Sequence, residues 1–122
     1  MASVLKQVIY YAIHPIVNSL DLKQKVLSAG DNDIITAPTG HSIKIKKLNI
    51  HNPTSSEATI YFKDIITKAN GTTDVITVGG KWKVGPGQTL EITMDDVPHA
   101  FTKLIINTDV ANLEVYGTVE VY

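Results

Sequence analysis

The sequence predicts an all-β protein: an antiparallel, jelly-roll-like β-sandwich with an amino-terminal arm. The first observation is that two runs of alternating apolar and polar residues, between positions 42 and 62, flank the polar turn Asn52-Pro53-Thr54-Ser55-Ser56-Glu57. Period-two alternation places one set of side chains in a core and the other in water, as in half-buried strands. The second is that the pattern recurs on both sides of Gly85-Pro86-Gly87-Gln88. Turn residues between alternating runs are typical of antiparallel sheets.

Length and composition limit the classes of protein to which this chain can belong. Its 122 residues, with 43% hydrophobic and 19% charged side chains, are typical of one folded domain with one core. Cysteine is absent, which excludes disulfides, a thiolate nucleophile and a cysteine-ligated metal. The net charge is −1 and all 11 basic residues are lysine. Because arginine is the usual residue for bidentate contacts to phosphate and guanine, we expect no nucleic-acid partner.

The amino-terminal sequence is apolar but predicts neither a membrane span nor a secretory signal. Residues 4–17 are interrupted by Lys6, His14 and Pro15 and fall short of the roughly 18 apolar residues that a membrane helix needs. We therefore expect no membrane partner and a mature chain that begins at or near Met1.

We assign residues 1–25 to an amino-terminal arm or edge segment and residues 26–122 to the sandwich domain. Apolar residues between positions 4 and 13 fit one helical face, yet their valines, isoleucines and tyrosines have β propensity. A strand or loosely ordered arm is favoured over a helix. Because this arm is too apolar to remain solvated, we expect it to bury against a neighbouring subunit, and an edge strand of its own sandwich is the alternative.

The strand at residues 43–50 carries a change of parity. Ile43 and Ile45 share one parity, Leu48 and Ile50 share the other, and Lys46-Lys47 lies between the two pairs. A β-bulge at Lys46-Lys47 would return all four apolar side chains to one face. A strand buried on both faces is the alternative, and it would need partners for the lysines.

Turn residues separate the later strands. Asn70-Gly71 lies between two apolar β-branched pairs and predicts a hairpin with a type I′ turn, which needs positive φ at both central residues. With Thr72 it also forms a glycosylation sequon, the alternative interpretation of these residues. The last strand is the most regular. Its predicted core face carries Leu113, Val115, Gly117, Val119 and Val121, and its outer face includes Tyr116 and Tyr122.

No motif in the chain predicts catalysis. The four histidines lack the spacing of paired metal ligands, and the two aspartate clusters, Asp31-Asn32-Asp33 and Asp95-Asp96, lack the spacing of a calcium loop. The serines and glycine-rich turns match neither a nucleophile elbow nor a phosphate loop. We therefore expect no enzyme activity, no metal site and no cofactor.

Aromatic side chains allow a binding function. Trp82 and Tyr61, with Tyr116 and Tyr122, would suit an aromatic platform that stacks on sugar rings. The alternative is that Trp82 belongs to the core and the tyrosines form cross-strand pairs. Exposed tyrosines on a strand would also suit a protein interface.

Three motifs follow one another in a fixed order along the chain. The first motif is the turn Asn-Pro-Thr-Ser-Ser-Glu-Ala-Thr, which precedes strand Ile60-Tyr61-Phe62. The second is the turn Gly85-Pro86-Gly87-Gln88-Thr89, which follows Trp82-Lys83-Val84. The third is the closing strand Leu113-Glu114-Val115-Tyr116-Gly117-Thr118-Val119. In this order they resemble a small β-sandwich module of virion structural proteins in tailed bacteriophages. The resemblance covers roughly residues 42–122.

The resemblance implies a non-enzymatic virion structural protein, most simply a capsid decoration (cement) protein and otherwise a tail or neck accessory. It implies a major capsid or other virion protein as partner, a location in the virion after assembly in the host cytoplasm, and a homo-oligomer with a trimer favoured. The expected protein-interface residues are Val8, Ile9, Tyr10, Tyr11, Tyr116 and Tyr122. The alternative is a carbohydrate- or receptor-binding module of a phage tail or adhesin that uses Trp82 and Tyr61.

Overall fold

The computed structural model describes residues 18–122, which form eight strands and, within this range, no helix. The strands are β1 (Asn18–Val26), β2 (Gly30–Thr36), β3 (Ile43–His51), β4 (Ala58–Thr67), β5 (Thr73–Val84), β6 (Thr89–Thr93), β7 (Lys103–Thr108) and β8 (Glu114–Val121). All neighbouring strands pair antiparallel. The predicted all-β class is confirmed.

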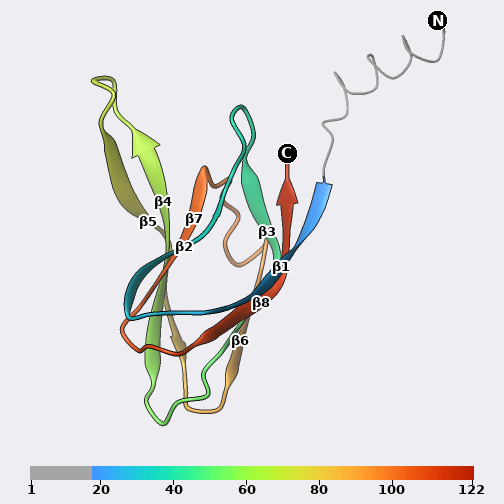
Figure 1. Cartoon of the computed structure of the whole chain (residues 1–122), viewed down its shortest axis with the longest axis vertical. Helices are drawn as coiled ribbons and strands as arrows, with labels where there is room; N and C mark the ends of the chain where they lie inside the picture. Colours follow the sequence, from blue (N-terminus) through green and yellow to red (C-terminus); the bar gives the residue numbers. More distant parts are fainter. Residues whose placement is uncertain (1–17) are drawn as a thin grey trace, which may run out of the picture.

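The strands form two four-stranded sheets, in the orders β1-β8-β3-β6 and β2-β7-β4-β5 (Figure 1). The β4–β5 hairpin is the one connection in the described chain that stays within a sheet, and every other connection crosses to the opposite sheet. This winding of eight antiparallel strands into two facing sheets is a jelly roll, so the predicted sandwich architecture is also confirmed.

The core lies between the inner faces of the two sheets. Its largest fully buried side chains are Phe62, Phe101, Leu27, Ile43, Ile45, Leu48, Ile50, Ile60, Ile92, Leu104, Ile106 and Leu113. These residues come from both sheets and from the connections between them, because alternation along each strand turns every second side chain inward. The predicted core face of the last strand is confirmed at Leu113, Val115 and Val119, which are all buried.

The predicted bulge in β3 is confirmed. The register of β3 against β8 shifts between Ile45 and Lys47, so Lys46 is the extra residue. Ile43, Ile45, Leu48 and Ile50 are consequently all buried, although their parity in the sequence differs. The extra residue resolves the parity conflict as a bulge should.

Strand β1 is an edge strand of its sheet and pairs with β8 from Asn18↔Val121 to Val26↔Glu114. It occupies positions 18–25 of the segment that the sequence assigned to an arm or edge. The rest of that segment, residues 1–17, lies outside the described residues.

The β4–β5 hairpin is confirmed, but the predicted type I′ turn is wrong. Gly71 has a positive φ of 84°, and Asn70 is not among the residues with positive φ. The Gly71 N–H donates to the Lys68 carbonyl (2.9 Å) and the Lys68 N–H to the Thr72 carbonyl (2.7 Å), which closes a three-residue loop. Asn70 Oδ1 accepts from both the N–H (3.1 Å) and the hydroxyl (2.7 Å) of Thr72. These local bonds stabilise the longer loop.

Asn52 joins two turns that are distant in the sequence. Its N–H donates to the Gln88 carbonyl (2.9 Å), and its carbonyl accepts from the Gly87 N–H (2.7 Å). Its fully buried side chain donates to the carbonyls of Ser56 (2.7 Å) and Val84 (3.1 Å). Two of the motifs that carry the sequence resemblance therefore meet at one end of the sandwich and have a structural role there.

Asn52→Ala is expected to lower the free energy of unfolding by about 2–3 kcal/mol. It removes the side-chain donor to the buried Val84 carbonyl and the acceptor of the Thr54 N–H, which donates to Asn52 Oδ1 (3.0 Å). Urea unfolding measures the loss. Thr54→Val is the control, since it removes the hydroxyl bond to Asn52 Oδ1 (2.6 Å), and we expect it to cost about 1 kcal/mol. Equal losses in the two variants would show that Asn52 is not the centre of this cluster.

Candidate functional site

Two of the predicted interface residues lie within the described residues: Tyr116 is on the outer face of β8, and Tyr122 directly follows this strand. Tyr116 is 41% exposed, and Tyr122 is partly buried. Six residues along a strand separate them by about 20 Å, so they do not form one continuous patch. The other predicted interface residues, Val8, Ile9, Tyr10 and Tyr11, lie outside the described residues.

Tyr122 is held by its neighbours on the same face. Its hydroxyl donates to Glu120 Oε2 (2.8 Å), and the Lys44 ammonium lies 4.8 Å from the centre of its ring. The hydrogen bond to Glu120, with smaller effects of burial and of the carboxylate charge, raises the pKa of Tyr122. Tyr116 is therefore the tyrosine of this strand that remains more available to a partner.

The structure does not bring Trp82 and Tyr61 together. Trp82 pairs with Ile60, faces the inside of the sandwich and packs against the core, and its indole Nε1 is buried without a hydrogen-bond partner in residues 18–122. Tyr61 pairs with Lys81 on one side and Asn107 on the other, on the outer face of the same sheet. Because neighbouring positions point to opposite faces, these two rings cannot stack on one sugar chain.

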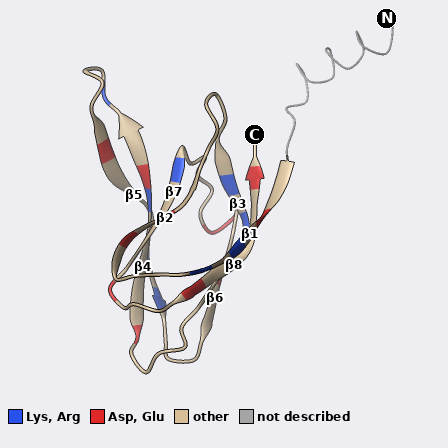
Figure 2. Cartoon of the chain, in the orientation of Figure 1, with Lys and Arg blue, Asp and Glu red and all other residues tan. Residues whose placement is uncertain are grey.

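The outer face of the β2-β7-β4-β5 sheet carries a network of charged and amide side chains. Asp31 Oδ1 accepts from Asn107 Nδ2 (2.7 Å) and pairs with Lys63 Nζ (3.0 Å), and Lys103 Nζ lies 2.8 Å from Asp33 Oδ2. The Asn107 hydrogen bond and the Lys63 contact hold the pKa of Asp31 below its usual value. Lysine and acidic positions are intermixed over both sheets (Figure 2), so neither charge sign dominates this surface.

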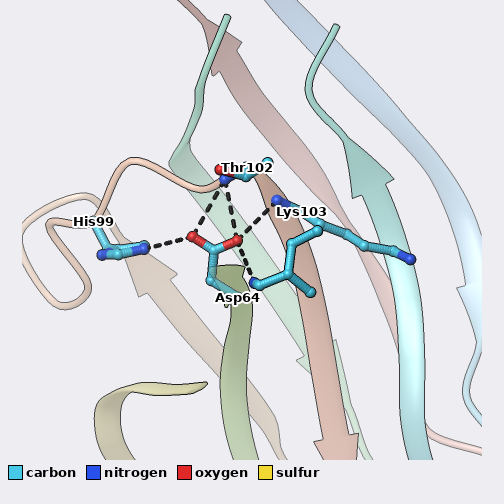
Figure 3. Close-up of polar contacts among 5 residues, drawn as sticks. Asp64, His99, Thr102 and Lys103 are labelled. Carbon is cyan, nitrogen blue, oxygen red and sulfur yellow. Dashed lines mark hydrogen bonds and ion pairs between the residues drawn. The ribbon is translucent and has the colours of Figure 1, made fainter. Parts of the chain in front are cut away.

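The most buried charged side chain of the described residues, Asp64, was not predicted. It lies on the inner face of β4, where both oxygens of its carboxylate are hydrogen-bonded to other residues (Figure 3). Oδ1 accepts the N–H groups of Ile65 (2.7 Å), Thr102 (3.1 Å) and Lys103 (2.9 Å), and Oδ2 lies 3.2 Å from the Thr102 N–H and 2.8 Å from His99 Nε2. The carboxylate fastens the β6–β7 connection and the start of β7 to β4.

The surroundings of Asp64 fit a structural role better than a catalytic one. The Asp64 side chain is 4% exposed and both oxygens accept hydrogen bonds from the chain, which leaves little access for a substrate. The ring of His99 meets Phe101 edge to face, with centroids 4.6 Å apart. The signal in the sequence was present, because Asp64 has the parity of the core residues Ile60 and Phe62.

Within residues 18–122, no group of three or more histidine, cysteine, aspartate or glutamate side chains is placed to hold a metal ion. No helix in this part of the chain is long and apolar enough to cross a membrane.

Comparisons with known proteins point to the fold. No family model matches the sequence, and no curated protein matches it. A chain in the structure of the infectious bursal disease virus Gx strain has a TM-score of 0.55 and 14% identity, over 88% of this chain and 32% of that chain. The VP2 subviral particle of infectious bursal disease virus has a TM-score of 0.47 and 20% identity, over 88% of this chain and 32% of that chain. The CBM22-1–GH10 modules of Clostridium thermocellum xylanase 10B, complexed with xylohexaose, have a TM-score of 0.44 and 9% identity, over 85% and 26%.

This chain therefore spans about one third of the length of the viral chains that it resembles. The likeness with the highest TM-score of the three shows that part of a chain in that virus structure has a similar fold.

Proposed function

We propose that this chain is a non-enzymatic structural module of a virus particle, and within that class a decoration (cement) protein that binds the capsid and stabilises it. The jelly-roll fold, similar to part of a chain in a virus structure, supports the broad class. The motif order that resembles tailed-phage virion modules supports the narrower one. A tail or neck accessory is the alternative within the same broad class.

The observation that carries the proposal is the apolar sequence that precedes the edge strand β1 along the chain. Val8, Ile9, Tyr10 and Tyr11 precede β1, which is an edge strand. On β1 itself, Leu20 is 45% exposed and Val26 is 57% exposed. An edge strand with exposed apolar side chains is a common place for association with another chain.

The buried polar groups of the described chain support a structural role. Asn32, Asn52, Asp64 and Thr108 each bond to backbone groups of the loops and strands, so they stabilise the scaffold. Adhesion of such rigid modules at symmetry-related positions would stabilise the particle by mass action, because bound subunits favour the assembled state. A trimer would match a threefold axis of a capsid.

Deleting residues 2–15 tests the proposal. The truncated chain is expected to keep its fold, with a melting temperature within about 5 °C of the full chain, and to lose co-sedimentation with particles that lack the protein. Purified particles should contain the full-length chain at a fixed ratio to the major capsid protein.

Unchanged co-sedimentation after the deletion would contradict the role given to the arm. A large fall in melting temperature would show instead that these residues belong to their own sandwich. Light scattering that finds a single 13.3 kDa species at micromolar concentration would contradict the trimer.

A further inference from the structure

Three strands of one sheet present an ordered outer surface that includes Tyr116. Across β8, β3 and β6, three rows of paired residues face outward: Glu114, His51 and Thr89; Tyr116, Asn49 and Glu91; Thr118, Lys47 and Thr93. We call these nine residues the Tyr116 face. Strands lie about 4.8 Å apart, so each row spans about 10 Å.

The two flanking rows are held by bonds within the protein. His51 Nδ1 lies 2.9 Å from Thr89 Oγ1 in one row. In the other row, the hydroxyl of Thr118 donates to Asp21 Oδ1 (2.9 Å) and that of Thr93 to Asp96 Oδ2 (3.1 Å). These bonds fix the rims of the face and reduce the entropy that a ligand would have to remove on binding.

The central row keeps its bonding groups available. No group of residues 18–122 forms a hydrogen bond with the Asn49 side-chain amide or the Tyr116 hydroxyl in this structure. Glu91 is paired through Oε2 with Lys47 Nζ at 3.6 Å, and its side chain is 54% exposed. The row therefore places an exposed aromatic ring, an amide and a carboxylate side by side on a strand framework.

This set of groups suits a sugar better than other ligands. An aromatic ring can cover the apolar C–H face of a pyranose, while an amide both donates and accepts and a carboxylate accepts bonds from hydroxyls. Lys47 is the one lysine among the nine residues and contacts a glutamate, so the face lacks the basic charge that phosphates require. Tyr116 is the one large aromatic or aliphatic side chain among the nine residues, and Val26 of β1, which pairs with Glu114, is the exposed apolar side chain beside them. A protein interface typically has a larger cluster of apolar anchors.

We propose that the Tyr116 face binds a neutral oligosaccharide, with Tyr116 stacking on one sugar ring and Asn49 and Glu91 bonding to its hydroxyls. This goes beyond the structural role proposed above, which was placed on the edge strand β1 and the residues before it. It also differs from the platform of Trp82 and Tyr61 that the sequence suggested.

The test is a titration of the isotope-labelled full chain with cellohexaose, xylohexaose and mannohexaose, followed by amide chemical shifts. At least one of these neutral sugars is expected to shift amides of the Tyr116 face and to leave the opposite sheet unchanged. Tyr116→Ala should weaken the binding at least about tenfold while the melting temperature stays near that of the parent, since the ring is partly exposed. Tyr116→Trp should retain binding, and Tyr116→Leu, which is apolar but cannot stack, should lose it.

Tyr61→Ala is the matched control, because Tyr61 is a partly exposed tyrosine on the outer face of the other sheet. Its sugar binding should equal that of the parent. The proposal is overturned if none of the three sugars shifts the Tyr116 face at millimolar concentration, or if Tyr61→Ala weakens binding as much as Tyr116→Ala. Loss of particle binding in Tyr116→Ala without any sugar binding would make the face a protein interface, which also overturns it.

Discussion

Replacing Gly117 with alanine is expected to lower the free energy of unfolding by about 3 kcal/mol or more. A Cβ at this position would lie 2.1 Å from the Lys47 carbonyl oxygen and 2.9 Å from Leu48 Cα. Both are backbone atoms of β3, so the contact can be relieved only by moving a central strand of the sheet. The φ of 151° adds strain, because residues with a side chain rarely adopt it. Urea unfolding of the purified variant measures the loss.

The position of Gly117 explains why space is so limited there. Its two neighbouring strands are both irregular at this level, with register shifts between Leu22 and Lys25 in β1 and between Ile45 and Lys47 in β3. The β3 bulge that returns the isoleucines to the core also pushes the Lys47 backbone against β8. Glycine in β8 is therefore the consequence of a bulge in β3.

Gly80→Ala separates steric contact from backbone strain. Gly80 also has a positive φ, 82°, but a Cβ there would have no atom within 4 Å. We expect this control to cost about 1–2 kcal/mol from strain alone. A loss in Gly117→Ala no larger than that in Gly80→Ala would show that the β3 backbone yields to the methyl group.

Asp64→Ala is expected to have a similarly large effect, about 3–5 kcal/mol of unfolding free energy, because several backbone donors lose their acceptor. The substitution removes the acceptor for the N–H groups of Ile65, Thr102 and Lys103, which lie in a partly buried site. Urea unfolding gives the loss, and hydrogen exchange of the Thr102 and Lys103 amides should become much faster. Exchange that stays as slow as in the parent would contradict the role of Asp64 in fastening this connection.

Two control variants separate the contributions of the individual Asp64 hydrogen bonds to the free energy of unfolding. His99→Ala removes one contact from a side chain that is 31% exposed, and we expect a loss of about 1 kcal/mol. Asp64→Asn keeps one acceptor oxygen but turns an N–H₂ group toward existing donors, so its loss should lie between those of the other two variants. A His99→Ala loss equal to that of Asp64→Ala would place the stabilisation in the contact with His99 instead of in the backbone bonds.

Local patterns in the sequence were enough for the fold class and for several of its details. Alternation predicted strands, and the parity change between Ile45 and Leu48 predicted the bulge, because burial on one face allows a single register. The hairpin at Asn70-Gly71 was predicted from a local pattern too, because an Asn-Gly pair between two apolar β-branched pairs is typical of a hairpin turn. Its turn type was missed because the Thr72 hydroxyl and N–H, which bond to Asn70, favour a longer loop.

The candidate site depended on contacts that no local pattern contains. Alternation placed Tyr116 outward, but its neighbours Asn49 and Glu91 come from strands that meet β8 only when the sheet order is known. Trp82 and Tyr61 were grouped by residue type, and their assignment to opposite faces follows from the register of β4 and β5.

The sequence by itself determined the β class, the positions of the later strands and turns, and the apolar character of the amino-terminal segment, because propensity and period-two burial are local properties. Tertiary structure alone decided the jelly-roll order of the strands, the hydrogen bonds of Asp64 with Thr102 and Lys103, and the contact of Gly117 with Lys47. Strand pairing and buried hydrogen bonds join residues that are dozens of positions apart, and the free energy that selects them exists only once both partners are in place.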